Sequence, residues 1–185
     1  MMKFKPIKLN GKRVILRRLE MKDARQIAKI ANDFKVAQYL ATVPYPYTLN
    51  HAEKWIKHSW KKKDGYDLGI ALKENDMIIG GVGIHHIGDK SDNKTGELGY
   101  WIGRKYWKQR YGKEASKLMI NHMFSKFGLR KIYARVYGPN IGSQKLLESL
   151  GFKKEGILRE QIKYRFGNRW LDEVYYGLLR GEWKK

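Results

Sequence analysis

Apolar residues recur along this chain at two alternating spacings, and the change from one to the other predicts a mixture of helices and strands. In the first half, apolar positions three and four residues apart predict helices over residues 22–32 and 50–61. Apolar and β-branched runs predict strands near residues 13–17, 66–73 and 77–86. The order of these elements indicates an α+β domain.

The second half of the chain continues the same pattern. A strand ends at Gly103 (YWIG), and the helix that follows has apolar residues at helical spacing from Ala115 to Phe127. Next come a strand over residues 131–138, a short helix from Asn140 that stops at Gly151, and strands over residues 154–166 and 170–179 joined by a turn at Gly167-Asn168. We expect the short helix to bury one face, formed by Ile141, Leu146, Leu147 and Leu150.

Residues 41–48 (ATVPYPYT) interrupt the helical pattern of the first half. Pro44 and Pro46 exclude a helix there and favour an ordered loop. Two interpretations stay open: the loop walls a substrate pocket, or it is a plain connection in which Tyr45 and Tyr47 pack locally.

The transition from the strand ending near Ile102 to the next helix has the features of an anion site. The first-turn amides of a helix have no intrahelical acceptor, and the helix dipole adds positive potential where they point. Lys108, Arg110 and Lys113 would raise that potential. The alternative is a solvated helix start. Asn140 and Ser143, at the start of the short helix, are explained by capping when taken alone.

Taken together, these segments resemble the GNAT superfamily of acetyl-CoA-dependent N-acetyltransferases, and within it the RimJ/RimL-like branch that acetylates protein N-termini. The resemblance covers nearly the whole chain, through the segments GKRVILR (11–17), ELGYWI (97–102), YWKQRYGKEA (106–115), NIGSQKLLESLGFKKEG (140–156) and WLDEVYYGLL (170–179). It implies one domain over residues 1–185, with a single mixed, mostly antiparallel twisted sheet of about seven strands and about four flanking helices. It also implies that the sheet splays open after the strand ending near Ile102, so that pantetheine pairs with exposed strand backbone.

The resemblance assigns the turn before the helix to the cofactor's pyrophosphate. The family motif, Gln/Arg-x-x-Gly-x-Gly/Ala, falls on residues 107–112 if Glu114-Ala115 fixes the register; Trp107 and Arg110 then depart from it. A register starting at Gln109 would instead make Gly112 the residue of close approach. Both registers stay open. The expected cofactor-binding residues are Trp101, Ile102, Gln109, Arg110, Tyr111, Gly112, Lys113, Asn140 and Ser143.

Acetyl transfer to an amine needs a proton acceptor for the amine, a donor to the thioester carbonyl and a proton for the leaving thiolate. By resemblance, Glu97 is the expected base, acting through water, and Ser143 is the expected proton donor or relay, with Tyr137 and Tyr111 as alternatives. The carbonyl oxygen would be held by a backbone amide near Ile102. A late-strand position that carries a glutamate in some relatives holds Ile162 here.

Acidic residues near the expected site bear on the acceptor. A cationic acceptor needs carboxylates close by, and Glu97, Glu160, Asp172 and Glu173 are the available ones. The expected acceptor is a peptide or protein N-terminal amine of the ribosomal-protein type. Small amines such as polyamines or antibiotics are the alternative.

The charge balance adds a second class of function. Lys and Arg number 39 against 18 Asp and Glu, which gives a net charge of +21 and a pI near 10.0. The phosphates of CoA account for part of this bias, and ribosomal RNA would be a fitting acidic contact. The competing hypothesis is therefore a basic RNA- or ribosome-binding module on the same fold, with weak or no catalysis. A generally lysine-rich surface explains the charge equally well.

Other features limit the remaining classes. The chain has no cysteine, which excludes disulfides, thiolate nucleophiles and zinc-thiolate sites, and its five histidines show no ligand spacing, so we expect no metal. The longest apolar run, residues 77–84, is too short to span a bilayer, and residues 1–10 mix charged and apolar positions, so we expect a cytoplasmic protein without a membrane contact. A monomer and a homodimer are both compatible with the sequence.

Overall fold

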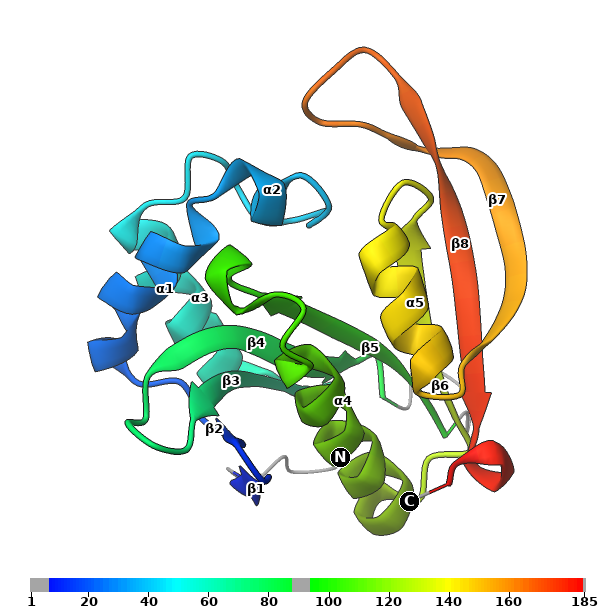
Figure 1. Ribbon diagram of the computed structural model, residues 1–185, viewed down its shortest axis with the longest axis horizontal. Helices are drawn as coiled ribbons and strands as arrows, with labels where there is room; N and C mark the ends of the chain where they lie inside the picture. Colours follow the sequence, from blue (N-terminus) through cyan, green and yellow to red (C-terminus); the bar gives the residue numbers. More distant parts are fainter. Residues whose placement is uncertain (1–6, 88–93, 185) are drawn as a thin grey trace.

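The computed structural model describes residues 7–87 and 94–184; residues 1–6, part of the N-terminal pattern noted above, lie outside it. Eight strands form one sheet in the order β1-β2-β3-β4-β5-β6-β8-β7 (Figure 1). Their bounds are β1 Leu9–Asn10, β2 Val14–Arg17, β3 Tyr66–Leu72, β4 Ile78–His85, β5 Thr95–Ile102, β6 Lys131–Tyr137, β7 Lys153–Lys163 and β8 Trp170–Leu179. The α-helices are α1 Ala24–Ala31, α2 Phe34–Ala37, α3 Leu49–Lys61, α4 Tyr111–His122 and α5 Ile141–Ser149. The expected α+β architecture is confirmed, with a short extra strand, β1, and a four-residue helix, α2, that the periodicity did not predict.

The sheet parts between β5 and β6. Every other pair of neighbouring strands is antiparallel, whereas β5 and β6 are parallel and pair only at Thr95↔Lys131, Gly96↔Ile132 and Glu97↔Tyr133. From Leu98 to Ile102, β5 is therefore paired with β4 on one side and with no described strand on the other. The predicted splay is confirmed, and it begins one residue after Glu97.

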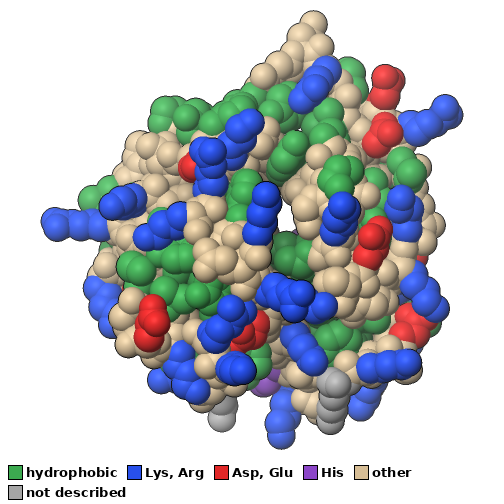
Figure 2. Space-filling view, viewed as in Figure 1, with side chains coloured by type: hydrophobic (Ala, Val, Ile, Leu, Met, Phe, Trp, Pro, Cys, Tyr) green, Lys and Arg blue, Asp and Glu red, His purple; other side chains and the backbone are tan. Residues whose placement is uncertain are grey.

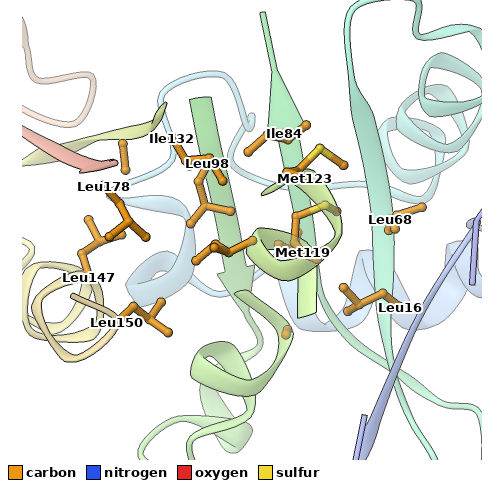
Figure 3. Close-up of a cluster of buried hydrophobic side chains, with 14 of the residues drawn as sticks. Leu16, Leu68, Ile84, Leu98, Met119, Met123, Ile132, Leu147, Leu150 and Leu178 are labelled. Carbon is orange, nitrogen blue, oxygen red and sulfur yellow. The ribbon is translucent and has the colours of Figure 1, made fainter. Parts of the chain in front are cut away.

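Helices cover both faces of the sheet and enclose two apolar cores. Helices α4 and α5 lie on the near face in Figure 1, and α1 and α3 lie behind the β3–β4 side. The larger core joins α4 and α5 to the sheet, and Met119 of α4 and Met123, just after it, pack over Ile84 and Leu98 (Figure 3). The smaller core, which includes Ile27, Ile56 and Ile78, sits between α1, α3 and the opposite face. Alternation along β5 thus sends successive side chains into different layers.

The face expected for α5 is wrong at one position. Leu147 and Leu150 are buried and Leu146 packs against the core, but Ile141 is 53% exposed. Ile141 is the first residue of the helix and lies nine residues before Leu150, so at 3.6 residues per turn it falls on the opposite side of the helix. A side chain on that side points away from the core.

A contact between distant segments closes the molecule across the parting. The β7–β8 hairpin arches toward the α2 region in Figure 1, and Nη1 of Arg165 at its tip donates to the carbonyl oxygens of Ala41 (3.0 Å) and Val43 (2.8 Å). Phe166 packs edge-on against Phe34 and Tyr45, with ring centroids 5.3 and 6.1 Å apart. The hairpin loop, which the sequence placed at Gly167-Asn168, is wider than expected because β7 already ends at Lys163.

Candidate active site

A cleft of about 870 Å³ occupies the space where the sheet parts. Its lining comes from both halves of the molecule: the loop after α2, α3, β4 and β5 on one side, and β6, α5, β7 and β8 on the other. Figure 2 shows an opening near the centre of one face, with Lys and Arg side chains on its rim. The loop over residues 41–48 satisfies both interpretations, because Thr42 and Val43 line the cleft while Tyr45 packs on Phe34 and Phe166.

The turn before α4 presents a run of unsatisfied amides. The first helical bond runs from the Glu114 amide to the Arg110 carbonyl, and the Trp107 amide donates back to Arg104. The backbone amides of residues 108 to 113 lie between these two bonds, and none of them donates to an acceptor among the described residues. Lys108, Arg110 and Lys113 place cationic side chains on the same segment. Free amides at a helix start next to fixed positive charge form an anion-binding site.

Backbone angles in this turn favour one of the two motif registers. Arg110 precedes α4 with φ +64°, and Lys108 has φ +60°, both in the left-handed region that glycine adopts most readily. A Cβ on Gly112 would lie 3.2 Å from the Leu146 side chain and 3.4 Å from that of Ile102. The side of Gly112 on which a Cβ would stand therefore faces α5 and β5 closely, and a side chain there would crowd them. Arg110, not Gly112, has the conformation expected at the close-approach glycine of the motif.

Neighbouring residues hold the turn in place. Glu114 accepts from the backbone amides of Arg13 (2.7 Å) and Val14 (3.2 Å) and pairs with the Arg13 side chain at 3.1 Å. Burial alone would raise the pKa of Glu114, but these hydrogen bonds and the Arg13 charge lower it overall. Arg13 also donates to the Gln109 carbonyl at 3.0 Å, so Gln109 contributes its backbone to the scaffold of the turn.

Trp107, Trp101 and Ile102 lie around the end of β5. Trp107 is 42% exposed and donates from Nε1 to the Ile102 carbonyl at 2.6 Å. Trp101 lines the cleft and packs edge-on against Trp55, with ring centroids 5.9 Å apart. The Ile102 side chain turns to the opposite layer, where it packs against the larger core.

The start of α5 brings two hydroxyl groups together in the cleft. Asn140 caps the helix by accepting from the Ser143 amide at 3.2 Å, as its isolated pattern predicts. The Ser143 hydroxyl lies 2.8 Å from the Tyr100 hydroxyl. Burial raises the pKa of Tyr100 well above its usual range, although the Ser143 contact opposes this. Tyr100 was not among the expected site residues, although strand alternation already places it on the face of β5 opposite Glu97.

Glu97 reaches the cleft from the other face of β5, beside Gly99 and Trp101, as the alternation predicts. Its two carboxylate oxygens accept from Nε and Nη2 of Arg135, both at 3.0 Å. The hydrogen bond to Glu97 is the largest cause that raises the pKa of Arg135. This partner could not be predicted, because Arg135 lies on β6 and meets β5 only through the parallel pairing.

The proposed alternatives to Ser143 occupy different places. Tyr137 lines the cleft, and burial together with the charge of Glu173 raises its pKa. Tyr111 does not line the cleft; it packs under the Arg13 guanidinium, 4.5 Å from the ring centroid. Of the acids considered for a cationic acceptor, Glu97 and Glu173 line the cleft, whereas Glu160 and Asp172 line a separate surface depression.

The adjacent histidines His85 and His86 lie in different environments. His85 lines the cleft near Asp67 and Lys62, and burial lowers its pKa, an effect that Asp67 opposes and Lys62 reinforces. His86 is half exposed, with φ +54°. In residues 7–87 and 94–184, no group of three or more potential ligands could hold a metal ion. Within the same ranges, no helix has the length and apolar character needed to cross a bilayer.

Comparison with known proteins agrees with this architecture. A curated relative, the uncharacterized N-acetyltransferase p20 of Bacillus licheniformis, is 30% identical over 177 residues, covering 95% of this chain and 97% of the relative. The structure of RimJ from Mycobacterium smegmatis in complex with CoA-disulfide aligns with a TM-score of 0.83 at 18% identity, covering 97% and 89% of the two chains. The structure of the ribosomal-protein-S5-alanine acetyltransferase from Vibrio fischeri aligns with a TM-score of 0.80 at 22% identity, covering 97% and 100%.

The family match includes β5 and β6, where the sheet parts, and the starts of α4 and α5. Residues 13–153 match the model of the acetyltransferase (GNAT) domain, which spans the segment from β2 to the beginning of β7. A match over most of the chain, together with the divided sheet, identifies this protein as a member of the GNAT family of acetyltransferases.

Proposed function

We propose that this N-acetyltransferase transfers the acetyl group of acetyl-CoA to a primary amine, and that the amine is the N-terminal α-amine of a peptide or protein. The observation that carries the proposal is the coincidence of two features on one strand. The edge of β5 that faces β6 is unpaired after Glu97, and the turn that follows β5 exposes the unpaired amides of residues 108 to 113. A long ligand with an anionic end and a part that can pair with strand backbone fits this arrangement.

Acetyl-CoA meets these requirements, and the chain's residues divide its binding. The amides of Arg110, Tyr111, Gly112 and Lys113 would hold the pyrophosphate, with the side chains of Arg110 and Lys113 adding charge. The free edge of β5 at Trp101 and Ile102 would pair with the pantetheine amides. Gln109 would support the turn through its backbone. Asn140 and Ser143 would lie along the same path at the start of α5.

The reaction needs no covalent enzyme intermediate. A neutral amine attacks the thioester carbonyl, a C–N bond forms, the C–S bond breaks, and the proton lost by the amine is balanced by one supplied to the thiolate. We assign proton acceptance to Glu97 through an intervening water. Its pairing with Arg135 fixes the direction of the carboxylate toward the cleft.

We assign the stabilisation and protonation of the leaving thiolate to Ser143. A serine hydroxyl is a weak acid, so its role is to hydrogen-bond the departing sulfur and relay a proton. The Tyr100 hydroxyl at 2.8 Å extends the relay and orients the Ser143 hydroxyl. Tyr137, on the cleft wall, is the second hydroxyl that could serve a ligand there.

Two observations support a chain end as the acceptor. The Arg165 contacts and the loop over residues 41–48 cross the cleft, so a narrow, extended group enters more easily than an amine on a flat folded surface. Two of the structural neighbours are named as RimJ and as a ribosomal-protein acetyltransferase, although their identities to this chain are 18% and 22%. Small linear amines fit the same opening and are the second candidates.

The test is a titration with acetyl-CoA followed by a thiol-release assay on a panel of N-terminal peptides and small amines. We expect micromolar or tighter binding of acetyl-CoA and CoA release that depends on the amine. Peptides with a free N-terminus should react, and the same peptides with a blocked N-terminus should not. Binding of RNA without affinity for acetyl-CoA would contradict the proposal.

A further inference from the structure

Glu173 is a buried carboxylate that the proposed reaction does not use. It lies on β8 with 6% of its surface exposed, and it lines the cleft. Its side chain makes no hydrogen bond or ion pair with any residue in the described part of the chain, although its charge acts on Arg135 and Tyr137. Burying an ionised group without a partner is unfavourable, so a carboxylate kept in such a place indicates a partner supplied from outside the chain.

The neighbouring charges do not supply that partner. Arg135 lies on the adjoining strand, but both oxygens of Glu97 already engage its guanidinium. Asp67, the third carboxylate on the cleft wall, is paired with Lys62 at 2.9 Å. Among the described acidic residues of the cleft, Glu173 is therefore the one without a hydrogen bond or ion pair of its own, and it shares the nearby charge of Arg135 with Glu97.

The position of Glu173 relates it to the reacting groups. β8 pairs with β6, and Glu173 lies directly opposite Tyr137 in the register. Residue 173 shares its sheet face with Tyr175, which is opposite Arg135, whereas Val174 and Tyr176 face the larger core. Arg135 in turn binds Glu97. The carboxylates of Glu97 and Glu173 thus flank one guanidinium on the same wall of the cleft.

We propose that Glu173 is the counter-ion that binds the acceptor as a cation. This inference rests on the proposed function and specifies the acceptor: the amine arrives as an ammonium group, and the Glu173 carboxylate holds its positive charge. Glu97 and its water then pass one ammonium proton to solvent, the neutral amine attacks, and the second proton that it loses is balanced by the one supplied to the thiolate. Glu173 is a positioning residue in this scheme. In a protein with a net charge of +21, two cleft carboxylates that share one guanidinium leave negative charge that attracts a cationic acceptor against repulsion from the surface.

The first experiment is steady-state kinetics of Glu173→Gln with a peptide acceptor. Glutamine keeps the size of the side chain and removes the charge. We expect the KM for the acceptor to rise about tenfold or more, while kcat changes less than about twofold and the Kd for acetyl-CoA is unchanged. Glu160→Gln, on the adjacent β7 but outside the cleft, is the matched control and should leave all three constants unchanged. A fall in kcat at constant KM, or no change at all, would overturn the assignment.

The second experiment needs no variant and separates charge from proton transfer. A peptide with a trimethylated N-terminus carries a permanent positive charge and cannot be deprotonated or acetylated. We expect the parent protein to bind it about tenfold more tightly than the same peptide with a neutral tert-butyl group in that place, as measured by calorimetry. Equal affinities would overturn the inference.

The two proposals fail in different ways. If the parent protein acetylates peptides but does not distinguish the two analogues, the role of Glu173 is wrong and the proposed function stands. If the parent protein prefers the charged analogue but releases no CoA, the cation site stands and the proposed reaction is wrong.

Discussion

Replacing Arg110 by glycine should strengthen the fold and weaken cofactor binding at the same time. Arg110 has φ +64°, a conformation that costs a non-glycine residue roughly 1–2 kcal/mol. Glycine removes this cost but adds about 0.5–1 kcal/mol of conformational entropy to lose on folding. The net expectation is a gain of about 0.5–1 kcal/mol in the free energy of unfolding. For a domain of this size, that raises Tm by about 1–4 °C.

The effect on binding has the opposite sign. The exposed guanidinium is worth no more than about 1 kcal/mol to a bound phosphate, because solvent and salt screen it. The Kd of acetyl-CoA should therefore rise about fivefold in Arg110→Gly at low salt. The difference should shrink when the ionic strength is raised tenfold, since added ions screen the parent's contact more than the variant's.

Calorimetric titration with acetyl-CoA at two salt concentrations, together with thermal unfolding, measures both effects. Arg159→Gln, on β7 and away from the turn, controls for a general loss of positive charge. If Arg110→Gly binds acetyl-CoA as tightly as the parent or more tightly, the guanidinium makes no contact with the phosphates. The turn would then work through its amides alone, and Arg110 would be only a strained substitute for glycine.

Four further predictions concern the cleft and its scaffold. Glu97→Gln should lower the rate at neutral pH by about a hundredfold and recover at high pH, where the amine is already neutral; a pH–rate profile of unchanged shape would remove Glu97 from the mechanism. Ser143→Ala and Tyr100→Phe should each lower kcat about tenfold, and the double variant should lose little more than the worse single variant, because one hydrogen bond joins them; strictly additive losses would show independent roles. Arg165→Ala should raise the KM of a peptide acceptor severalfold without changing the Kd of acetyl-CoA; equal changes in both constants would argue against a role confined to the acceptor side. Glu114 has a lowered pKa in the fold, so its stabilisation is present above its ordinary pKa of about 4.3 and is lost as the pH falls through the folded value; the Tm gap between the parent and Glu114→Gln should therefore be widest near neutral pH, and a gap that persists at about pH 3 would contradict this.

Local patterns were sufficient for most of the fold. The strands and the longer helices follow from periodicity, because each must bury one face against the sheet. The four-residue α2 escaped prediction because it spans little more than one helical turn, too short for apolar spacing to define a face. Ile141 was misplaced for a different reason: it lies five and six residues before Leu146 and Leu147, and at 3.6 residues per turn these spacings put it on the other side of the helix.

Contacts between side chains on different strands could not be predicted from the sequence. The pairing of Glu97 with Arg135 depends on three parallel pairs between β5 and β6, strands separated in sequence by the whole of α4. The position of Glu173 depends on β8 inserting between β6 and β7. No turn or spacing signal encodes such an order, whereas Asn140 and Ser143 could be placed because a helix cap is a local structure.

Alternation along β5 explains how one short strand can serve both substrates of the proposed reaction. Glu97 and Trp101 face the acid-lined part of the cleft, and Tyr100, one residue before Trp101, faces α5 and reaches the Ser143 hydroxyl. In an unbroken sheet these two sides would be separated by the backbone of β6. Because the pairing with β6 stops at Glu97, a thioester lying along the free edge of β5 would be open to both sides. An amine could then approach from the carboxylate side while the sulfur leaves toward the hydroxyls, so the parting of the sheet is what allows the proton acceptor and the proton donor to act on opposite faces of one carbonyl.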